Sequence, residues 1–141
     1  INIRNPNSVR PWQHVLEPLS GYILLAKKLY LEKKSLGNSI YQSPFNFGPS
    51  DNFDKSVKDL IIEVIKNWEG KFQIENNKDP LYESNHLSLI SKKAKVHLNW
   101  EQKWNFEKTV NRTINWYKQV HEGSSSLDCC MKDINLFMKE K

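Results

Sequence analysis

The sequence predicts a mixed α+β domain in which about five helices are combined with a few short strands. Its 141 residues are enough for one domain with a core of its own. Apolar residues recur at helical spacing in several segments. The segments with strand-like alternation are short, and they are too few for a good independent sheet. We therefore expect residues 1–141 to form a single domain, of the kind that covers one side of a larger one.

Two strands and two helices are predicted in the first half of the chain. Residues 1–4 alternate and run into an Asn-Pro-Asn turn, which indicates a short strand. Residues 14–34 keep apolar positions at helical spacing. Residues 43–49 have the composition of a short aromatic strand closed by Gly-Pro. Residues 57–68 show the cleanest helical pattern, with apolar side chains at i, i+3, i+4, i+7, i+8 and i+11. Three residues before this helix offer caps for its amino terminus, namely Asp51, Asn52 and Asp54.

Two short strands and three helices are predicted in the second half. Residues 71–75 alternate like a strand, and residues 86–90 form another short strand. Residues 91–98 and residues 105–121 have helical spacing. A Gly-Ser-Ser-Ser break then precedes the last helix. The apolar residues of that helix, which we expect to pack inward, are Leu127, Met131, Ile134, Phe137 and Met138.

The net charge of +5 comes mostly from lysine. Of 21 basic residues, 18 are lysine and three are arginine. Acidic residues interrupt almost every lysine run, so a solvated lysine surface is favoured over a nucleic-acid-binding face. No stretch approaches the ~18 apolar residues of a membrane span. The first residues, Ile-Asn-Ile-Arg, have neither the basic nor the apolar region of a signal peptide, and they look like the inside of a longer protein.

Several kinds of active site are not indicated. Cys129 and Cys130 are adjacent, which excludes a disulfide framework and fits a reduced, cytoplasmic compartment. The four histidines are scattered, so no metal site is expected. The five glycines form neither a G-x-G-x-x-G motif nor a P-loop. Tyr30 and Lys34 have the Tyr-x-x-x-Lys spacing of a dehydrogenase pair, which we interpret as coincidence at the lysine-rich end of an amphipathic helix. No catalytic residue is therefore predicted in this chain.

The strongest local signal is a loop with two arginines near the amino terminus. Arg4 and Arg10 stand in a chain that otherwise uses lysine, and Trp12 follows them. Arginine is needed where a planar fork must grip a phosphate or a carboxylate with two hydrogen bonds. One interpretation is an anion site in which Arg10 binds a phosphate with help from backbone N–H groups. The other is a structured turn whose arginines stack on Trp12.

This loop also carries a resemblance to a known family. Residues 4–15 are Arg-Asn-Pro-Asn-Ser-Val-Arg-Pro-Trp-Gln-His-Val, followed by Leu-Glu-Pro-Leu-Ser-Gly-Tyr, and this resembles the CDP-glucose 4,6-dehydratases, which are extended short-chain dehydrogenase/reductase enzymes. Phe-Asn-Phe-Gly-Pro at 45–49 and Leu-Asn-Trp at 98–100 are similar to further motifs of the family, in the same order. The segment from Trp104 to the Trp-Tyr pair at 116–117 is similar to its late helix. The resemblance covers essentially the whole chain.

The resemblance implies that this chain is the C-terminal, substrate-binding subdomain of a longer enzyme. A Rossmann domain that binds NAD and carries the catalytic residues precedes this part in the family, and none of those residues lies here. The implied parent reaction converts CDP-D-glucose to CDP-4-keto-6-deoxy-D-glucose and water, for dideoxysugars of O-antigen polysaccharide. We expect the fragment alone to bind no cofactor and to be inactive, and the full-length enzyme to be a homo-oligomer.

The resemblance also implies substrate contacts, residue by residue. Arg10 matches the arginine that grips the diphosphate, in agreement with the argument from the loop itself, and Arg4 is expected as a second phosphate contact. Tyr82 and Glu83 match a His-Glu or His-Asp pair near the diphosphate and ribose, with tyrosine in place of histidine.

Two further contacts are implied for the nucleotide. Ile3 belongs to the strand that runs along the base. Asp51 matches a position that is asparagine in related dehydratases and contacts the nucleotide.

Two alternatives to this prediction stay open. One is another sugar-nucleotide dehydratase or epimerase, of the GDP-mannose or dTDP-glucose type. The other is a non-enzymatic basic adaptor that binds an acidic partner. Preference for CDP over UDP and GDP, and dependence of that binding on Arg10, would separate these possibilities.

Overall fold

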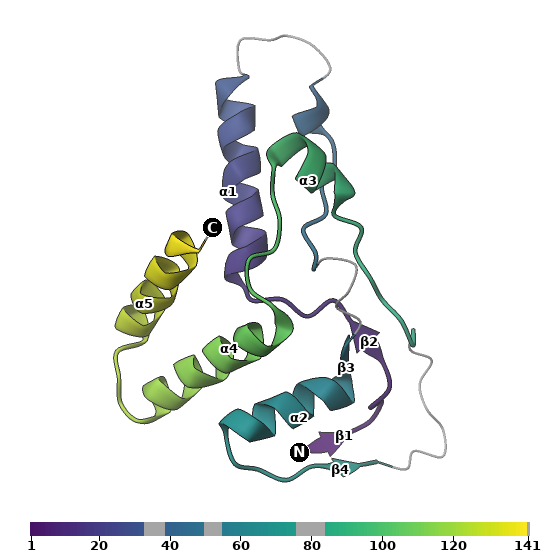
Figure 1. Ribbon diagram of the computed structural model, residues 1–141, viewed down its shortest axis with the longest axis vertical. Helices are drawn as coiled ribbons and strands as arrows, with labels where there is room; N and C mark the ends of the chain where they lie inside the picture. The colour runs from purple at the N-terminus through teal and green to yellow at the C-terminus, as the bar shows by residue number, and fades with distance from the viewer. Residues whose placement is uncertain (33–38, 50–54, 76–83, 141) are drawn as a thin grey trace.

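The computed structural model describes residues 1–32, 39–49, 55–75 and 84–140. Within these segments it has five α-helices, one short 3-10 helix and strands of two residues each (Figure 1), which confirms the predicted fold class. None of the helices in the described segments combines the length and apolar character needed to cross a membrane. In chain order the elements are β1 (Asn2–Ile3), β2 (Val9–Arg10), α1 (Leu16–Leu31), η1 (Ile40–Gln42), β3 (Lys55–Ser56), α2 (Val57–Asn67), β4 (Gln73–Ile74), α3 (Lys92–Leu98), α4 (Phe106–His121) and α5 (Ser126–Lys139).

The strands form two separate sheets of two strands each. β1 pairs with β4 in parallel, and β2 pairs with β3 antiparallel. The strand predicted at 86–90 is wrong, because within the described residues this segment contributes a single bridge, from His86 to Val9. Residues 44–49 are also outside any strand. Their aromatic side chains pack into the core instead of alternating along a ladder.

One part of the core lies between α1, α3 and the segment before residue 50. Phe47 and Trp100 are buried there with their rings edge to face, 5.1 Å between centroids. Ala94 and Leu98 of α3 complete the cluster. Gly21 of α1 is required for this packing, because a Cβ atom at that position would lie 2.2 Å from the Phe47 ring. Figure 1 shows α1 and α3 side by side in the upper half of the molecule.

A second part of the core joins α4 and α5 to the start of α1. Trp104 is fully buried and its ring meets Phe137 of α5 edge to face, at 5.2 Å between centroids. The fully buried Glu17 carboxylate accepts hydrogen bonds from the backbone N–H groups of Lys103 and Trp104. This carboxylate therefore fixes the first turn of α1 to the turn that precedes α4.

The helix boundaries follow local capping. The Ser56 side chain accepts a hydrogen bond from the Asp59 N–H, and the Asp59 carboxylate accepts from the Ser56 N–H, which is a capping box. The caps predicted at 51, 52 and 54 lie outside the described residues. Helix α1 begins two residues later than predicted, and its predicted last residue, 34, also lies outside the described residues.

The predicted inner face of α5 is only partly correct. Phe137 is buried as expected, but Leu127, Met131 and Met138 are exposed. Cys129 and Asp133 are buried in their place. The physical reason is an ion pair between Asp133 and Arg112 of α4, which turns the polar Asp133 toward the neighbouring helix.

Candidate functional site

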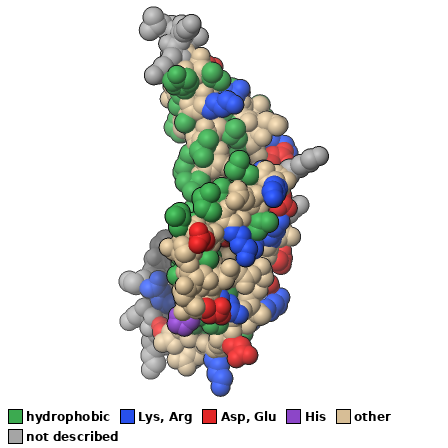
Figure 2. Space-filling model, turned by 90° about the vertical axis from the view of Figure 1, so that its left-hand side faces the viewer, with side chains coloured by type: hydrophobic (Ala, Val, Ile, Leu, Met, Phe, Trp, Pro, Cys, Tyr) green, Lys and Arg blue, Asp and Glu red, His purple; other side chains and the backbone are tan. Residues whose placement is uncertain are grey.

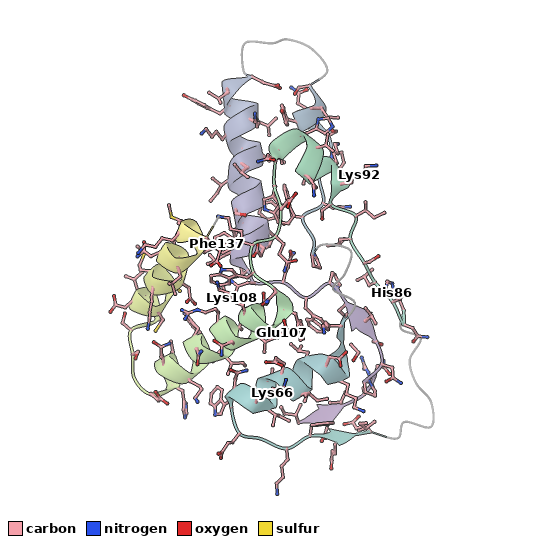
Figure 3. All side chains as sticks on the ribbon, in the orientation of Figure 1. Lys66, His86, Lys92, Glu107, Lys108 and Phe137 are labelled. Atoms are coloured by element: carbon pink, nitrogen blue, oxygen red, sulfur yellow. The ribbon has the colours of Figure 1, made fainter. Side chains whose placement is uncertain are left out.

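The arginine loop is held between two distant segments of the chain. β2 lies between β3 on one side and residues 84–87 on the other. The Val9 N–H donates to the Asn85 carbonyl at 2.8 Å, and the Leu87 N–H donates to the Val9 carbonyl at 3.2 Å. Figure 3 shows His86 on the segment that runs beside β2. Three segments therefore meet at the position of Arg10.

Arg10 is oriented by backbone carbonyls. Its half-buried side chain donates from Nη1 to the Val9 carbonyl at 2.7 Å and to the Ser84 carbonyl at 2.9 Å. These two hydrogen bonds to carbonyl oxygens fix the orientation of the guanidinium. Trp12 is fixed separately, because its Nε1 donates to the Lys55 carbonyl at 3.0 Å. Stacking of the arginines on Trp12 stays a prediction.

Three of the predicted contact residues lie outside the described residues, namely Asp51, Tyr82 and Glu83. The described residues beside them are nevertheless informative. Ser84 follows Glu83 directly and accepts the hydrogen bond from Arg10. Lys55 pairs with Arg10 across β2 and β3. The described segments that follow these predicted contacts therefore both begin next to Arg10, at Lys55 and at Ser84.

Ile3 and Arg4 belong to the other small sheet. Ile3 is 4% exposed, and its carbonyl accepts from the Glu75 N–H at 2.9 Å. A buried side chain cannot stack on a base, so a nucleotide contact at Ile3 would have to be made by its backbone. Arg4 follows β1 directly and is exposed. The structure therefore places Ile3 and Arg10 in different sheets rather than in one row.

Gln13 was not predicted from the sequence as a site residue. Its Nε2 donates to the Phe47 carbonyl at 2.8 Å, so it ties the arginine loop to the segment that leads toward residue 50. The sequence offers only its place in the resemblance as a signal, because glutamine by itself indicates no chemistry.

Beside this loop lie the buried side chains of His14, Glu17 and Asp133, together with the half-buried Arg112. Burial and the nearby Arg112 cation lower the pKa of His14 to about 4, so the imidazole is neutral at neutral pH. Burial raises the pKa of Glu17, against the opposing effect of the N–H groups of Trp104 and Lys103. The contacts of these side chains join helices to one another, which indicates a structural role.

A metal centre is not indicated by the described part of the chain. In the segments that the structure covers, no three His, Cys, Asp or Glu side chains are grouped so that they could hold a metal ion. What the loop offers chemically is a positioned cation beside backbone groups, which suits the binding of an anion.

Comparison with known proteins gives a relative that matches almost the whole chain. The chain is 36% identical over 138 residues to the CDP-glucose 4,6-dehydratase of Salmonella typhimurium. The match covers 96% of this chain and 37% of that enzyme. No protein-family model matches the chain. The resemblance inferred from the arginine loop is confirmed, and along nearly its entire length this chain is related to about a third of a CDP-glucose 4,6-dehydratase.

Proposed function

We propose that this chain is the C-terminal, sugar-nucleotide-binding part of a CDP-glucose 4,6-dehydratase. The observation that supports this most directly is the 36% identity along 96% of the chain. The parent enzyme would convert CDP-D-glucose to CDP-4-keto-6-deoxy-D-glucose and water.

The work of this chain is to bind and orient the substrate. Arg10 is the central residue, because its guanidinium is held in place by the Val9 and Ser84 carbonyls. A diphosphate carries the charge and the oxygen spacing that such a fork binds. The nucleotide lies along the backbone of β1, and Arg4 supplies a second positive charge at the end of that strand.

The NAD that such a reaction requires does not fit this chain. Its five glycines are residues 21, 37, 48, 70 and 123, and this spacing matches no Gly-rich phosphate-binding motif. Gly21 lies against the Phe47 ring, where a phosphate has no room. The cofactor and the catalytic groups therefore belong to other polypeptide, and this chain alone is inactive.

Titration of CDP into the purified chain tests the substrate site. Replacing Arg10 by alanine removes a charge-assisted bidentate contact, which costs about 1.5–3 kcal/mol or about 10–150-fold in affinity. Lys132→Ala is the matched control, because it removes one positive charge from the exposed side of α5. Isothermal titration calorimetry should show weaker binding for Arg10→Ala alone.

Other outcomes would point elsewhere. Equal affinity of wild type and Arg10→Ala for CDP would remove the site assignment. Tighter binding of UDP or GDP than of CDP would favour another sugar-nucleotide dehydratase or epimerase.

A further inference from the structure

Helix α1 is apolar on two opposite sides. Its inner side packs on the core through Gly21, Leu24 and Leu25. Its solvent side carries large apolar side chains at i, i+4, i+7, i+8 and i+15, a spacing that places them together on one side of a helix. These residues, which we call the outer face, are Val15, Leu19, Tyr22, Ile23 and Tyr30, and all are exposed.

The outer face lacks the charges of a normal surface helix. From residue 15 to residue 26 the sequence contains one charged residue, Glu17, whose side chain is fully buried. A helix at a protein surface is polar on its solvent side, whereas a helix that is apolar all round lies in an interior. Figure 2 shows the hydrophobic side chains gathered in a band over the upper half of the molecule, at the height of α1.

A hollow of about 570 Å³ lies at the amino-terminal end of the outer face. Val15 and Leu19 line it together with Tyr117 of α4 and with Cys130 and Ile134 of α5. Most of this lining is apolar, so the hollow suits a large apolar side chain from whatever covers the face.

We infer that the outer face of α1 is covered by further polypeptide of the same dehydratase, with an apolar side chain of that polypeptide seated in the hollow. This inference rests on the proposed function, since the related enzyme has most of its length outside the 37% that this chain matches. Helix α1 is then an interior helix packed between two layers.

Thiol labelling tests which surface is covered. The first protein is this chain, diluted to low micromolar concentration, and the second is a full-length chimera in which this chain replaces the matched part of the Salmonella enzyme. Ile23→Cys probes the outer face, and Val96→Cys on α3 is the matched control, since Ile23 is 69% and Val96 66% exposed. The native Cys130 probes the hollow. Maleimide labelling is followed by mass spectrometry of each cysteine peptide.

The inference predicts similar rates at residues 23 and 96 in the isolated chain. In the chimera, labelling at residues 23 and 130 should slow at least tenfold relative to residue 96. If the labelling rates at residues 23 and 130 relative to residue 96 were the same in the chimera as in the isolated chain, the inference would be overturned. It would also be overturned if these relative rates returned to their isolated-chain values when the chimera was diluted, because a second copy would then be covering the face.

A second measurement does not need the chimera to fold. Ile23→Glu and Val96→Glu in the isolated chain, held at a low micromolar concentration at which self-association does not contribute, should have the same urea midpoint as wild type, because neither side chain is packed. A lower midpoint for Ile23→Glu alone would show that this chain covers its own face, and would overturn the inference. CDP affinity is measured separately, so failure here is distinguishable from failure of the Arg10 site.

Discussion

At the scale of single residues, the buried side chains beside the arginine loop make the stability of the chain depend on pH. His14 is 6% exposed, its ring lies 4.7 Å from the Trp104 ring, and its Nδ1 accepts from the Leu16 N–H at 3.3 Å. Its pKa falls from 6.5 to about 4 on folding, because of burial and the Arg112 cation. Between about pH 6.5 and about pH 4, the His14 imidazole therefore binds a proton in the unfolded chain but not in the folded chain.

We predict that the free energy of unfolding falls as the pH is lowered from about 6.5 to about 4, by about 3 kcal/mol for His14 alone. Glu17 has the opposite sign, since its raised pKa favours proton uptake by the folded chain. The His14 contribution is therefore the difference between wild type and His14→Asn, which keeps an acceptor for the Leu16 N–H. Urea titrations between pH 4 and pH 7 measure it. Parallel pH profiles for the two proteins would contradict the prediction.

The candidate site shows what can be predicted from residue types and what cannot. Arg10 could be singled out because arginine is rare here and its chemistry suits a phosphate. Its carbonyl partner on Ser84 lies 74 positions away, and no local pattern indicates that contact. Arg112 is another of the three arginines in the chain, yet it forms an ion pair with Asp133 between two helices. Scarcity therefore singles out an arginine, but only the structure shows that Arg112 forms an internal ion pair, and ligand binding at Arg10 stays a prediction.

At the scale of elements, the helices with one apolar side were predicted within a residue. The predicted 57–68 and 105–121 correspond to Val57–Asn67 and Phe106–His121. Periodicity finds such helices because burial on one side imposes it. It does not say where the partner lies, which is why Met131 and Met138 of α5 were placed inside and are exposed. The two-residue strands carry too little pattern for their partners to be predicted.

The contact between α1 and the segment before residue 50 gives a test at this scale. Alanine favours helices by about 1 kcal/mol over glycine. At Gly21, however, the new Cβ would lie 2.2–2.7 Å from the ring of Phe47, which is itself buried against Trp100. We predict that Gly21→Ala lowers the free energy of unfolding by about 1–3 kcal/mol, since overpacking outweighs propensity.

The control for this substitution is Gly70→Ala, where the nearest atom would be the Trp68 carbonyl oxygen at 3.9 Å. Urea unfolding should give a clearly lower free energy of unfolding for Gly21→Ala than for Gly70→Ala. A Gly21→Ala protein as stable as wild type would mean that Phe47 can move away, and that the contact between α1 and the core is loose.

At the scale of the whole molecule, the described residues form two small cores and leave many large apolar side chains exposed. The buried apolar residues fall into one group around Phe47 and Trp100 and another around Trp104 and Phe137. Between them, α1 presents its outer face to solvent. Among the described residues, ten hydrophobic side chains are buried and twenty large ones are exposed, so the isolated chain should be only marginally stable.

We predict that the isolated chain self-associates as its concentration rises, because an exposed apolar band of this kind drives association. The net charge of +5 opposes association at low salt. Added salt screens that repulsion and strengthens burial of apolar surface, so the apparent mass from light scattering should rise with ionic strength. Ile23→Glu should shift the chain toward the monomer, whereas Val96→Glu, at a similarly exposed position on α3, should do so much less. The prediction would be contradicted if the wild-type chain stayed monomeric at high salt and unfolded only at high temperature. The outer face of α1 would then need no cover, and the two cores would be sufficient to stabilise the isolated chain.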